Sequence, residues 1–180
     1  MRIVVMGVAG CGKSTVAEAL ARRIGADYVD GDSLHPKANI DKMAGGHPLS
    51  DSDRGPWLEA VGAVLRKDGT VVACSALKRA YRDIICRSAG RSDPVTFLYL
   101  RGDRELLKAR MEARTRHFMP VSLLDSQLET LEEPGPDENA VAIDIHRTVP
   151  DIVKTFLEAI GPLSARDQSA RIQAPGAASA

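Results

Sequence analysis

One short segment near the start of the chain restricts the possible folds more than any other. The apolar run Ile3–Met6 is followed directly by Gly7-Val8-Ala9-Gly10-Cys11-Gly12-Lys13-Ser14. A continuously apolar run rich in β-branched residues is typical of a strand buried on both faces of a parallel sheet. Over residues 14–24, apolar side chains recur at three- and four-residue spacings, which predicts a helix. The strand, glycine-rich corner and helix together indicate an α/β unit.

The corner between that strand and that helix fits the pattern G-x-x-x-x-G-K-[ST], the phosphate-binding P-loop. Its glycines allow backbone N–H groups to turn toward a phosphate chain, and the helix N-terminus adds a partial positive charge there. We expect Lys13 to reach the β- and γ-phosphates of ATP and the Ser14 hydroxyl to bind Mg²⁺. A turn that merely closed the corner would not require a lysine followed by a serine.

The rest of the chain alternates apolar strand-like segments with helical ones. Strands are predicted at 26–29, 70–74, 95–100 and 140–144, and helices at 56–66, 79–88, 103–114 and 150–160. Strands that alternate with helices pair in parallel through right-handed crossovers. We therefore predict a doubly wound five-stranded parallel sheet in a single domain over 1–161. The polar, mixed stretch 33–57 predicts an inserted substrate-binding lobe, and the composition of 162–180 predicts a disordered tail.

Charge and cysteine content exclude several classes of protein. The chain has 24 basic and 24 acidic residues among its 180, a balance that argues against a protein that coats nucleic acid. Cys11, Cys74 and Cys86 show no C-x-x-C spacing, so neither a disulfide framework nor a zinc knuckle is predicted. Redox control through Cys11, beside the glycine loop, is the alternative to simple packing. The apolar start of the chain is too short for a signal peptide or a membrane span, so we expect a cytoplasmic protein.

An acidic pair follows the second predicted strand. Asp30-Gly31-Asp32 stands where a strand of a doubly wound sheet ends at the ligand crevice. Phosphoryl transfer to an alcohol requires a carboxylate directed at the hydroxyl, so Asp32 is the candidate base. Asp30 is a candidate for holding Mg²⁺ through water. The alternative is that both aspartates only form an Asx turn around Gly31.

Basic residues are placed to contact an acceptor. His35 is a candidate donor to the acceptor, with a surface or capping histidine as the alternative. Ser75 and Lys78 follow the third predicted strand, again at the carboxyl edge of the sheet. Lys78 and Arg82 have the i, i+4 spacing that places two side chains on one helix face, which suits a carboxylate or a phosphate. A solvated basic face that includes Arg79 would produce the same spacing.

A second basic cluster lies further along the chain. Arg110, Arg114, Arg116 and His117 precede Phe118-Met119-Pro120. Closing lids of kinases bring such arginines onto the transferred phosphoryl group, and Arg114 is the candidate for this catalytic role. A solvated helix face is the alternative for each of these residues taken singly.

These motifs, taken in order, resemble the small P-loop gluconokinases, which are relatives of shikimate and nucleoside monophosphate kinases. The segments that carry the resemblance lie between Met6 and Pro134: MGVAGCGKS, DGDSLHP, NIDKMAGGHPLSDSDRGPWL, VVACSALKRAYRD, FLYLRGD and HFMPVSLLDSQLETLEEP. The long middle segment is the most specific, because shikimate and nucleotide kinases do not carry it. The Ala-rich tail has no counterpart in the family pattern.

The resemblance implies a P-loop kinase fold and ATP-dependent phosphorylation of D-gluconate at its 6-hydroxyl, with a lid at about 114–133 and a homodimeric assembly. The ATP–Mg²⁺ site would comprise Gly7, Gly10, Cys11, Gly12, Lys13, Ser14, Thr15, Asp30 and Arg110. The acceptor site would comprise Asp32, His35, Arg54, Ser75, Lys78, Arg82 and Gln127. From the residues alone, a kinase of another small hydroxy acid or of a nucleoside monophosphate fits about as well. A non-catalytic nucleotide switch is the alternative from a different class.

Overall fold

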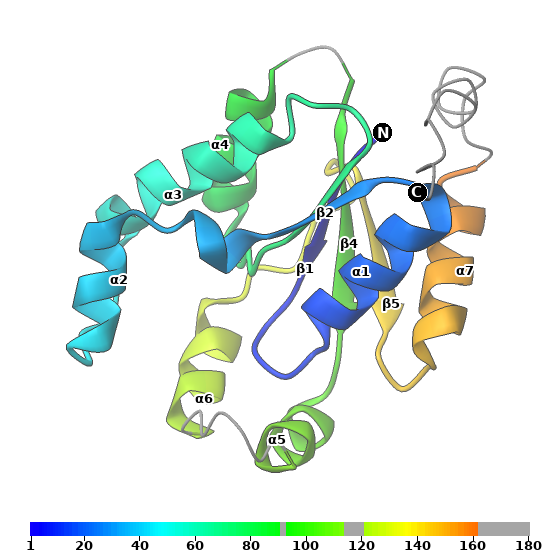
Figure 1. The fold of residues 1–180 in the computed structure, drawn as a ribbon. Coiled ribbons are helices and arrows are strands. Elements are labelled where there is room, and N and C mark those ends of the chain that lie inside the picture. Colours follow the sequence, from blue (N-terminus) through cyan, green and yellow to red (C-terminus); the bar gives the residue numbers. More distant parts are fainter. Residues whose placement is uncertain (91–92, 114–120, 162–180) are drawn as a thin grey trace, which may run out of the picture.

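A parallel sheet organises the molecule (Figure 1). The structure is a computed structural model that describes residues 1–90, 93–113 and 121–161, except the side chains of 121–123. In these ranges five strands pair in the order β2-β3-β1-β4-β5, and every neighbouring pair is parallel. The strands are β1 (Arg2–Met6), β2 (Asp27–Asp30), β3 (Thr70–Ala73), β4 (Val95–Arg101) and β5 (Ala140–Asp144). The predicted fold class is confirmed.

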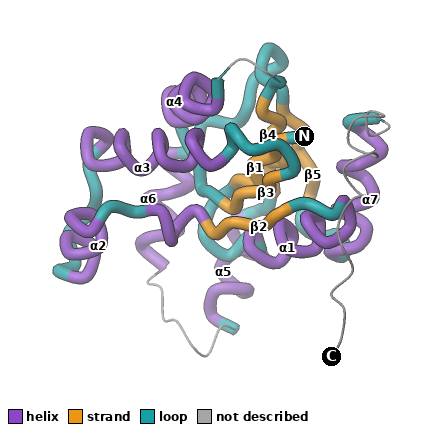
Figure 2. Tube along the Cα trace, turned by 45° about the horizontal axis from the view of Figure 1, so that its top comes forward, coloured by secondary structure: helices purple, strands orange, loops and turns teal. Residues whose placement is uncertain are grey.

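Helices cover both faces of this sheet. They are α1 (Lys13–Ile24), α2 (Lys37–Ala44), α3 (Asp51–Val64), α4 (Arg79–Ala89), α5 (Arg104–Glu112), α6 (Val121–Thr130) and α7 (Val149–Ala159), with a short 3₁₀ helix η1 (Gly31–Leu34). Figure 2 shows α1 and α7 on one side of the sheet and α3 and α4 on the other. The α2 helix extends outward beside the start of α3, where the inserted lobe was predicted.

Alternating side chains of the central strands supply the two halves of the core. Ile3 and Val5 of β1 pack with α1 and α7, whereas Val4 and Met6 pack with α3 and α4. All four side chains are fully buried. This double burial explains why the strand is apolar at every position rather than at every second one.

One helix boundary differs clearly from its prediction. The helix predicted at 56–66 begins five residues earlier, at Asp51. Ser50 and Asp53 form a capping box, in which the Ser50 hydroxyl accepts a hydrogen bond from the Asp53 N–H and the Asp53 carboxylate accepts one from the Ser50 N–H. Pro56 therefore lies inside the helix instead of opening it. The other predicted helices and strands agree with the structure within two residues.

Two predicted segments lie wholly or partly outside the described residues. The predicted tail at 162–180 is one, and residues 114–120 of the predicted lid are the other. Among the helices that the structure describes, none is long and apolar enough to cross a membrane.

Candidate active site

The glycine-rich loop connects β1 to α1 in a conformation that requires its glycines. Gly10 has a φ of +82°, and a Cβ added there would lie 3.1 Å from the Leu107 carbonyl oxygen. Gly12 precedes α1 with a φ of +92° and offers no side chain to cap the helix. The N-terminal amides of α1 are therefore not capped by the preceding residue, which is the arrangement that favours an anion.

Polar contacts from other elements tie this loop down. The Ala9 N–H donates to Gln127 Oε1 of α6 at 2.7 Å, and the Gly7 N–H donates to the Ser75 carbonyl oxygen at 3.3 Å. Lys13 Nζ donates to the Val8 carbonyl oxygen at 3.0 Å, so its ammonium group lies over the loop. Both Gln127 and Ser75, which were predicted as acceptor contacts, thus touch the phosphate loop.

Cys11 is packed rather than presented to solvent. Its side chain is buried, and a Cβ added at Gly7 would lie 2.8 Å from the Cys11 Sγ. Burial raises the pKa of the Cys11 thiol, and the charge of Lys13 only partly offsets that effect. A protonated thiol is a poor nucleophile, so the environment favours packing over redox chemistry.

The two aspartates after β2 have different environments. Asp30 Oδ1 accepts a hydrogen bond from the Asp32 N–H at 3.0 Å and so caps η1. Ser33 Oγ donates to the Asp30 carbonyl oxygen at 2.6 Å. The predicted Asx turn is therefore present, but it uses only the Asp30 side chain. Asp32 is exposed, so its carboxylate is accessible to an acceptor.

Asp32 and Lys13 lie at the same edge of the sheet, on either side of β3. Cys74 follows β3, which lies between β1 and β2. Burial raises the pKa of Cys74 to about 12, and the charges of both Asp32 and Lys13 also act on it, in opposite directions. Asp32 follows β2 and Lys13 follows β1, so the candidate base and the phosphate-loop lysine both lie at the carboxyl end of the central strands. The carboxyl end of the strands is where an open α/β sheet is expected to bind its ligand.

Gly31 allows the turn that carries Asp30 and Asp32 to lie directly against β3. A Cβ added at Gly31 would lie 2.4 Å from the Ala73 carbonyl oxygen, a backbone atom that cannot rotate away. We expect Gly31→Ala to destabilise the fold by about 1–3 kcal/mol, as overpacking typically does. Urea unfolding measures this change.

Gly55→Ala is the matched control, because a Cβ added at Gly55 inside α3 meets nothing within 4 Å. Alanine in a helix is expected to be neutral or to stabilise the protein by up to about 1 kcal/mol. Equal free energies of unfolding for the two variants would contradict the close approach at Gly31.

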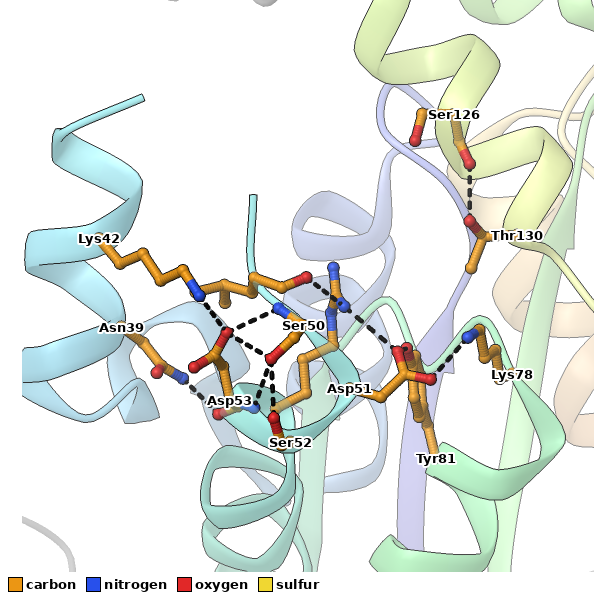
Figure 3. A network of polar contacts seen from close by, with 12 residues as sticks. Asn39, Lys42, Ser50, Asp51, Ser52, Asp53, Lys78, Tyr81, Ser126 and Thr130 are labelled. Carbon is orange, nitrogen blue, oxygen red and sulfur yellow. Dashed lines mark hydrogen bonds and ion pairs between the residues drawn. The ribbon is translucent and has the colours of Figure 1, made fainter. Parts of the chain in front are cut away.

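A cationic cluster surrounds one carboxylate at the start of α3 (Figure 3). Lys78 Nζ lies 2.7 Å from Asp51 Oδ2, and Arg54 Nη1 lies 3.5 Å from Asp51 Oδ1. The Tyr81 hydroxyl donates to the same carboxylate. Hydrogen bonds from Lys78 and Tyr81 lower the pKa of Asp51. The cluster therefore contains the donors that bind a carboxylate.

Asp51 and Tyr81 were not among the site residues predicted from the sequence. Tyr81 has the spacing of an ordinary core residue of α4, and its ring is in fact buried. Lys78 Nζ and Arg54 Cζ lie 5.5 and 5.8 Å from the centre of that ring. The aromatic residue three positions after Lys78 was the only indication available in the sequence.

Arg82 does not reach this cluster. Its side chain is 1% exposed, and its Nε and Nη2 donate to the Glu138 carboxylate at 2.5 and 2.9 Å. Its Nη1 donates to the carbonyl oxygens of Ala76, Leu77 and Glu132. The i, i+4 argument placed Lys78 and Arg82 on one helix face, but Lys78 is the N-cap residue with an extended backbone, so the two side chains separate. The structure gives Arg82 a structural environment instead of an acceptor site.

The second basic cluster is only partly described. Arg110 Nη2 donates to the Ile145 carbonyl oxygen at 2.7 Å. Arg114, Arg116 and His117 lie outside the described residues. Arg104 of α5 binds both carboxylate oxygens of Asp125 of α6, at 2.7 and 3.1 Å, a link that the sequence analysis did not predict.

Comparison with known proteins identifies the family. The sequence model of a family described as an AAA domain matches residues 3–134. The thermoresistant gluconokinase of Escherichia coli K12 is 42% identical to this chain over 163 residues, which cover 87% of this chain and 91% of the relative. This chain belongs to the gluconokinase family. The gluconokinase of Gluconobacter oxydans is 46% identical over 156 residues, covering 84% of this chain and 85% of that relative.

Solved structures agree with this membership. The crystal structure of a gluconokinase from Sinorhizobium meliloti has a TM-score of 0.80 and 45% identity, and the match covers 97% of each chain. A shikimate kinase from Bacteroides thetaiotaomicron has a TM-score of 0.65 at 14% identity, over 89% of this chain and 98% of that one, which shows a shared fold only. The P-loop kinase fold implies nucleotide binding.

Proposed function

We propose that this chain transfers the γ-phosphoryl group of ATP to the 6-hydroxyl of D-gluconate, giving 6-phospho-D-gluconate and ADP. The observation that carries the proposal is that three features follow the neighbouring parallel strands β1, β2 and β3 and so lie at the carboxyl edge of the sheet. These are the phosphate loop, the exposed Asp32 and the Lys78–Arg54 cluster. The names of the similar proteins, gluconokinases in each case, support the choice of acceptor.

The proposed reaction assigns a separate task to each group. The Asp32 carboxylate accepts the proton of the 6-hydroxyl while that oxygen forms a bond to the γ-phosphorus and the bond to ADP breaks. The Lys13 ammonium offsets the negative charge on the β- and γ-phosphates. Arg114, outside the described residues, stays a proposed contact of the transferred group.

The acceptor is held through its carboxylate. Lys78 and Arg54 already bind the Asp51 carboxylate, so their donors fit a second group of the same chemistry. His35 directly follows η1, which carries Asp32, and the charges of Asp32 and Arg54 both act on its pKa. A sugar acid with a carboxylate at one end and a primary hydroxyl at the other would place the hydroxyl at Asp32.

The oxygen groups near the loop fit Mg²⁺. Ser14 is exposed at the first turn of α1, and Asp30 uses only Oδ1 for its cap. A hydroxyl and a carboxylate are the hard oxygen ligands that Mg²⁺ takes together with water and phosphate oxygens. Ser14 and Asp30 would hold the ion, which neutralises charge on the phosphate oxygens when bound.

An acceptor panel in a coupled ADP-release assay tests the proposal. The panel contains D-gluconate, D-glucose, shikimate and a nucleoside monophosphate. D-glucose is the matched control, because it offers a 6-hydroxyl without a carboxylate. We expect rapid ADP release with gluconate and little with glucose. Turnover of shikimate or the nucleotide without turnover of gluconate would overturn the proposed acceptor.

A further inference from the structure

Trp57 of α3 contacts both the aspartate turn and the His35 ring. The indole is 3% exposed, and its Nε1–H donates to the Gly31 carbonyl oxygen at 2.7 Å. The His35 ring stacks on the indole with a centroid separation of 4.2 Å and an interplanar angle of 13°. One rigid side chain thus fixes the plane of His35 and the turn that carries Asp32.

Asn39 of α2 determines which ring nitrogen of His35 carries the proton. Asn39 is 5% exposed, and its Nδ2 donates to the Asp53 carbonyl oxygen at 2.8 Å. A carbonyl oxygen only accepts, so this contact fixes the amide orientation. The same Nδ2 lies 3.4 Å from His35 Nδ1. Since Nδ2 has only donor hydrogens, Nδ1 is the acceptor, and the proton of the neutral ring lies on Nε2.

We propose that Asn39 and Trp57 are positioning residues that hold His35 as a neutral imidazole protonated on Nε2, so that Nε2–H donates a hydrogen bond to an oxygen of the acceptor. This inference rests on the proposed function, because it assigns a role within the same acceptor site. Nε2 is the ring nitrogen that Asn39 leaves unoccupied, and the stack on Trp57 fixes the direction in which it points.

The charges that face the ring agree with a neutral state. Burial lowers the pKa of His35, the Asp32 carboxylate from η1 raises it, and Arg54 from α3 lowers it again. From α2, the ring meets the uncharged Asn39 amide, and the charged Lys42 there is bound to Asp53 at 2.6 Å. A protonated His35 would stabilise the charged form of Asp32 and weaken it as a base. A neutral donor binds the acceptor without this cost.

The first measurement is the ¹⁵N spectrum of the full chain labelled at histidine. Long-range ¹H–¹⁵N correlations distinguish the two neutral tautomers and the charged ring, and His35→Gln assigns the His35 signals among the four histidines. We expect an unprotonated Nδ1 and a protonated Nε2 at pH 7.5 without substrate. A ring protonated on Nδ1, or on both nitrogens, would overturn the inference. This result does not depend on which acceptor the enzyme uses.

The second measurement compares two variants that both cut a link between α2 and α3 (Figure 3). Asn39→Ala removes the donor to His35 as well as the bond to Asp53, whereas Lys42→Met removes only the Lys42–Asp53 ion pair. We expect Asn39→Ala to raise the KM for gluconate about tenfold, the value of one hydrogen bond, and to give a mixture of tautomers. The KM for ATP should not change.

Lys42→Met is expected to leave the His35 tautomer and the KM for gluconate as they are in the unmodified protein. Equal effects of the two variants would mean that Asn39 only holds α2 against α3. That outcome would refute the positioning role. Asn39→Asp is the second variant if Asn39→Ala does not fold. Its carboxylate accepts rather than donates, so the proton should move to Nδ1 and the KM should rise in the same way. If the panel reveals another acceptor, the KM values are measured for that acceptor instead.

Discussion

Asp32→Asn is expected to lower kcat for gluconate phosphorylation by a factor of about 10²–10⁴, the contribution of a positioned general base. The asparagine side chain keeps the size of aspartate but cannot accept the proton of the hydroxyl. Nucleotide affinity should change little, because the phosphate loop is anchored by Gln127 and Ser75 and not by Asp32. The coupled ADP-release assay measures kcat, and a fluorescence titration with ADP measures nucleotide binding.

Asp41→Asn is the isosteric control for that substitution. Asp41 lies on the exposed side of α2 and, among the residues that the structure describes, its side chain pairs only with Lys37, both side chains being largely in solvent. This variant should keep the kcat of the unmodified protein. Full activity in Asp32→Asn would contradict the assignment of Asp32 as the base, whereas loss of nucleotide binding would indicate a collapsed turn.

The fold was predictable because its determinants are local. Each apolar strand is marked by its own residues, and the glycine loop fixes the β1–α1 corner without reference to distant parts of the chain. The start of α3 was missed for a different reason: Pro56 is a common first-turn residue and concealed the capping box that Ser50 forms with Asp53. The sequence offers two possible first residues for this helix, Asp51 and Pro56, and does not show which of them is used. The choice depends on how Trp57 packs in the folded protein.

Asp32 and Lys78 could be predicted from the residues alone because each follows a strand within a few residues, at the carboxyl edge of the sheet. Asp51 and Tyr81 meet across 30 residues of sequence, and the stack of His35 on Trp57 joins a loop to a helix. No spacing rule predicts such contacts, because they depend on how α3 packs against the turn after β2.

The buried pair of Arg82 and Glu138 is another contact that the sequence does not reveal, since 56 residues separate its members. We expect Glu138→Ala to destabilise the fold by about 3–5 kcal/mol, because it leaves the Arg82 guanidinium buried without a counter-ion. Asp137→Ala is the matched control. The neighbouring pair of Asp137 with Arg79 is half exposed on both sides, so its loss should lower the free energy of unfolding far less. Urea unfolding measures both values.

Acid provides an independent test of the same pair. Hydrogen bonds from Arg82 lower the pKa of Glu138 below its ordinary value of 4.5. A carboxylate whose pKa is lower in the folded state contributes stability above about pH 4.5, and this contribution is lost as the pH falls through the folded-state pKa. The free energy of unfolding should therefore fall less steeply below pH 4.5 in Glu138→Ala than in the unmodified protein. Identical slopes would contradict the ion pair.

The same variant distinguishes a structural Arg82 from one that binds the acceptor. With Glu138 removed, a structural arginine leaves the KM for gluconate unchanged at temperatures where the protein stays folded. An arginine that contacts the acceptor carboxylate would be freed by the loss of its partner, and the KM would shift. The structure favours the first outcome, because the Arg82 donors are committed to Glu138 and to three carbonyl oxygens. Lys78 and Arg54 then remain as the cations proposed to recognise the sugar acid.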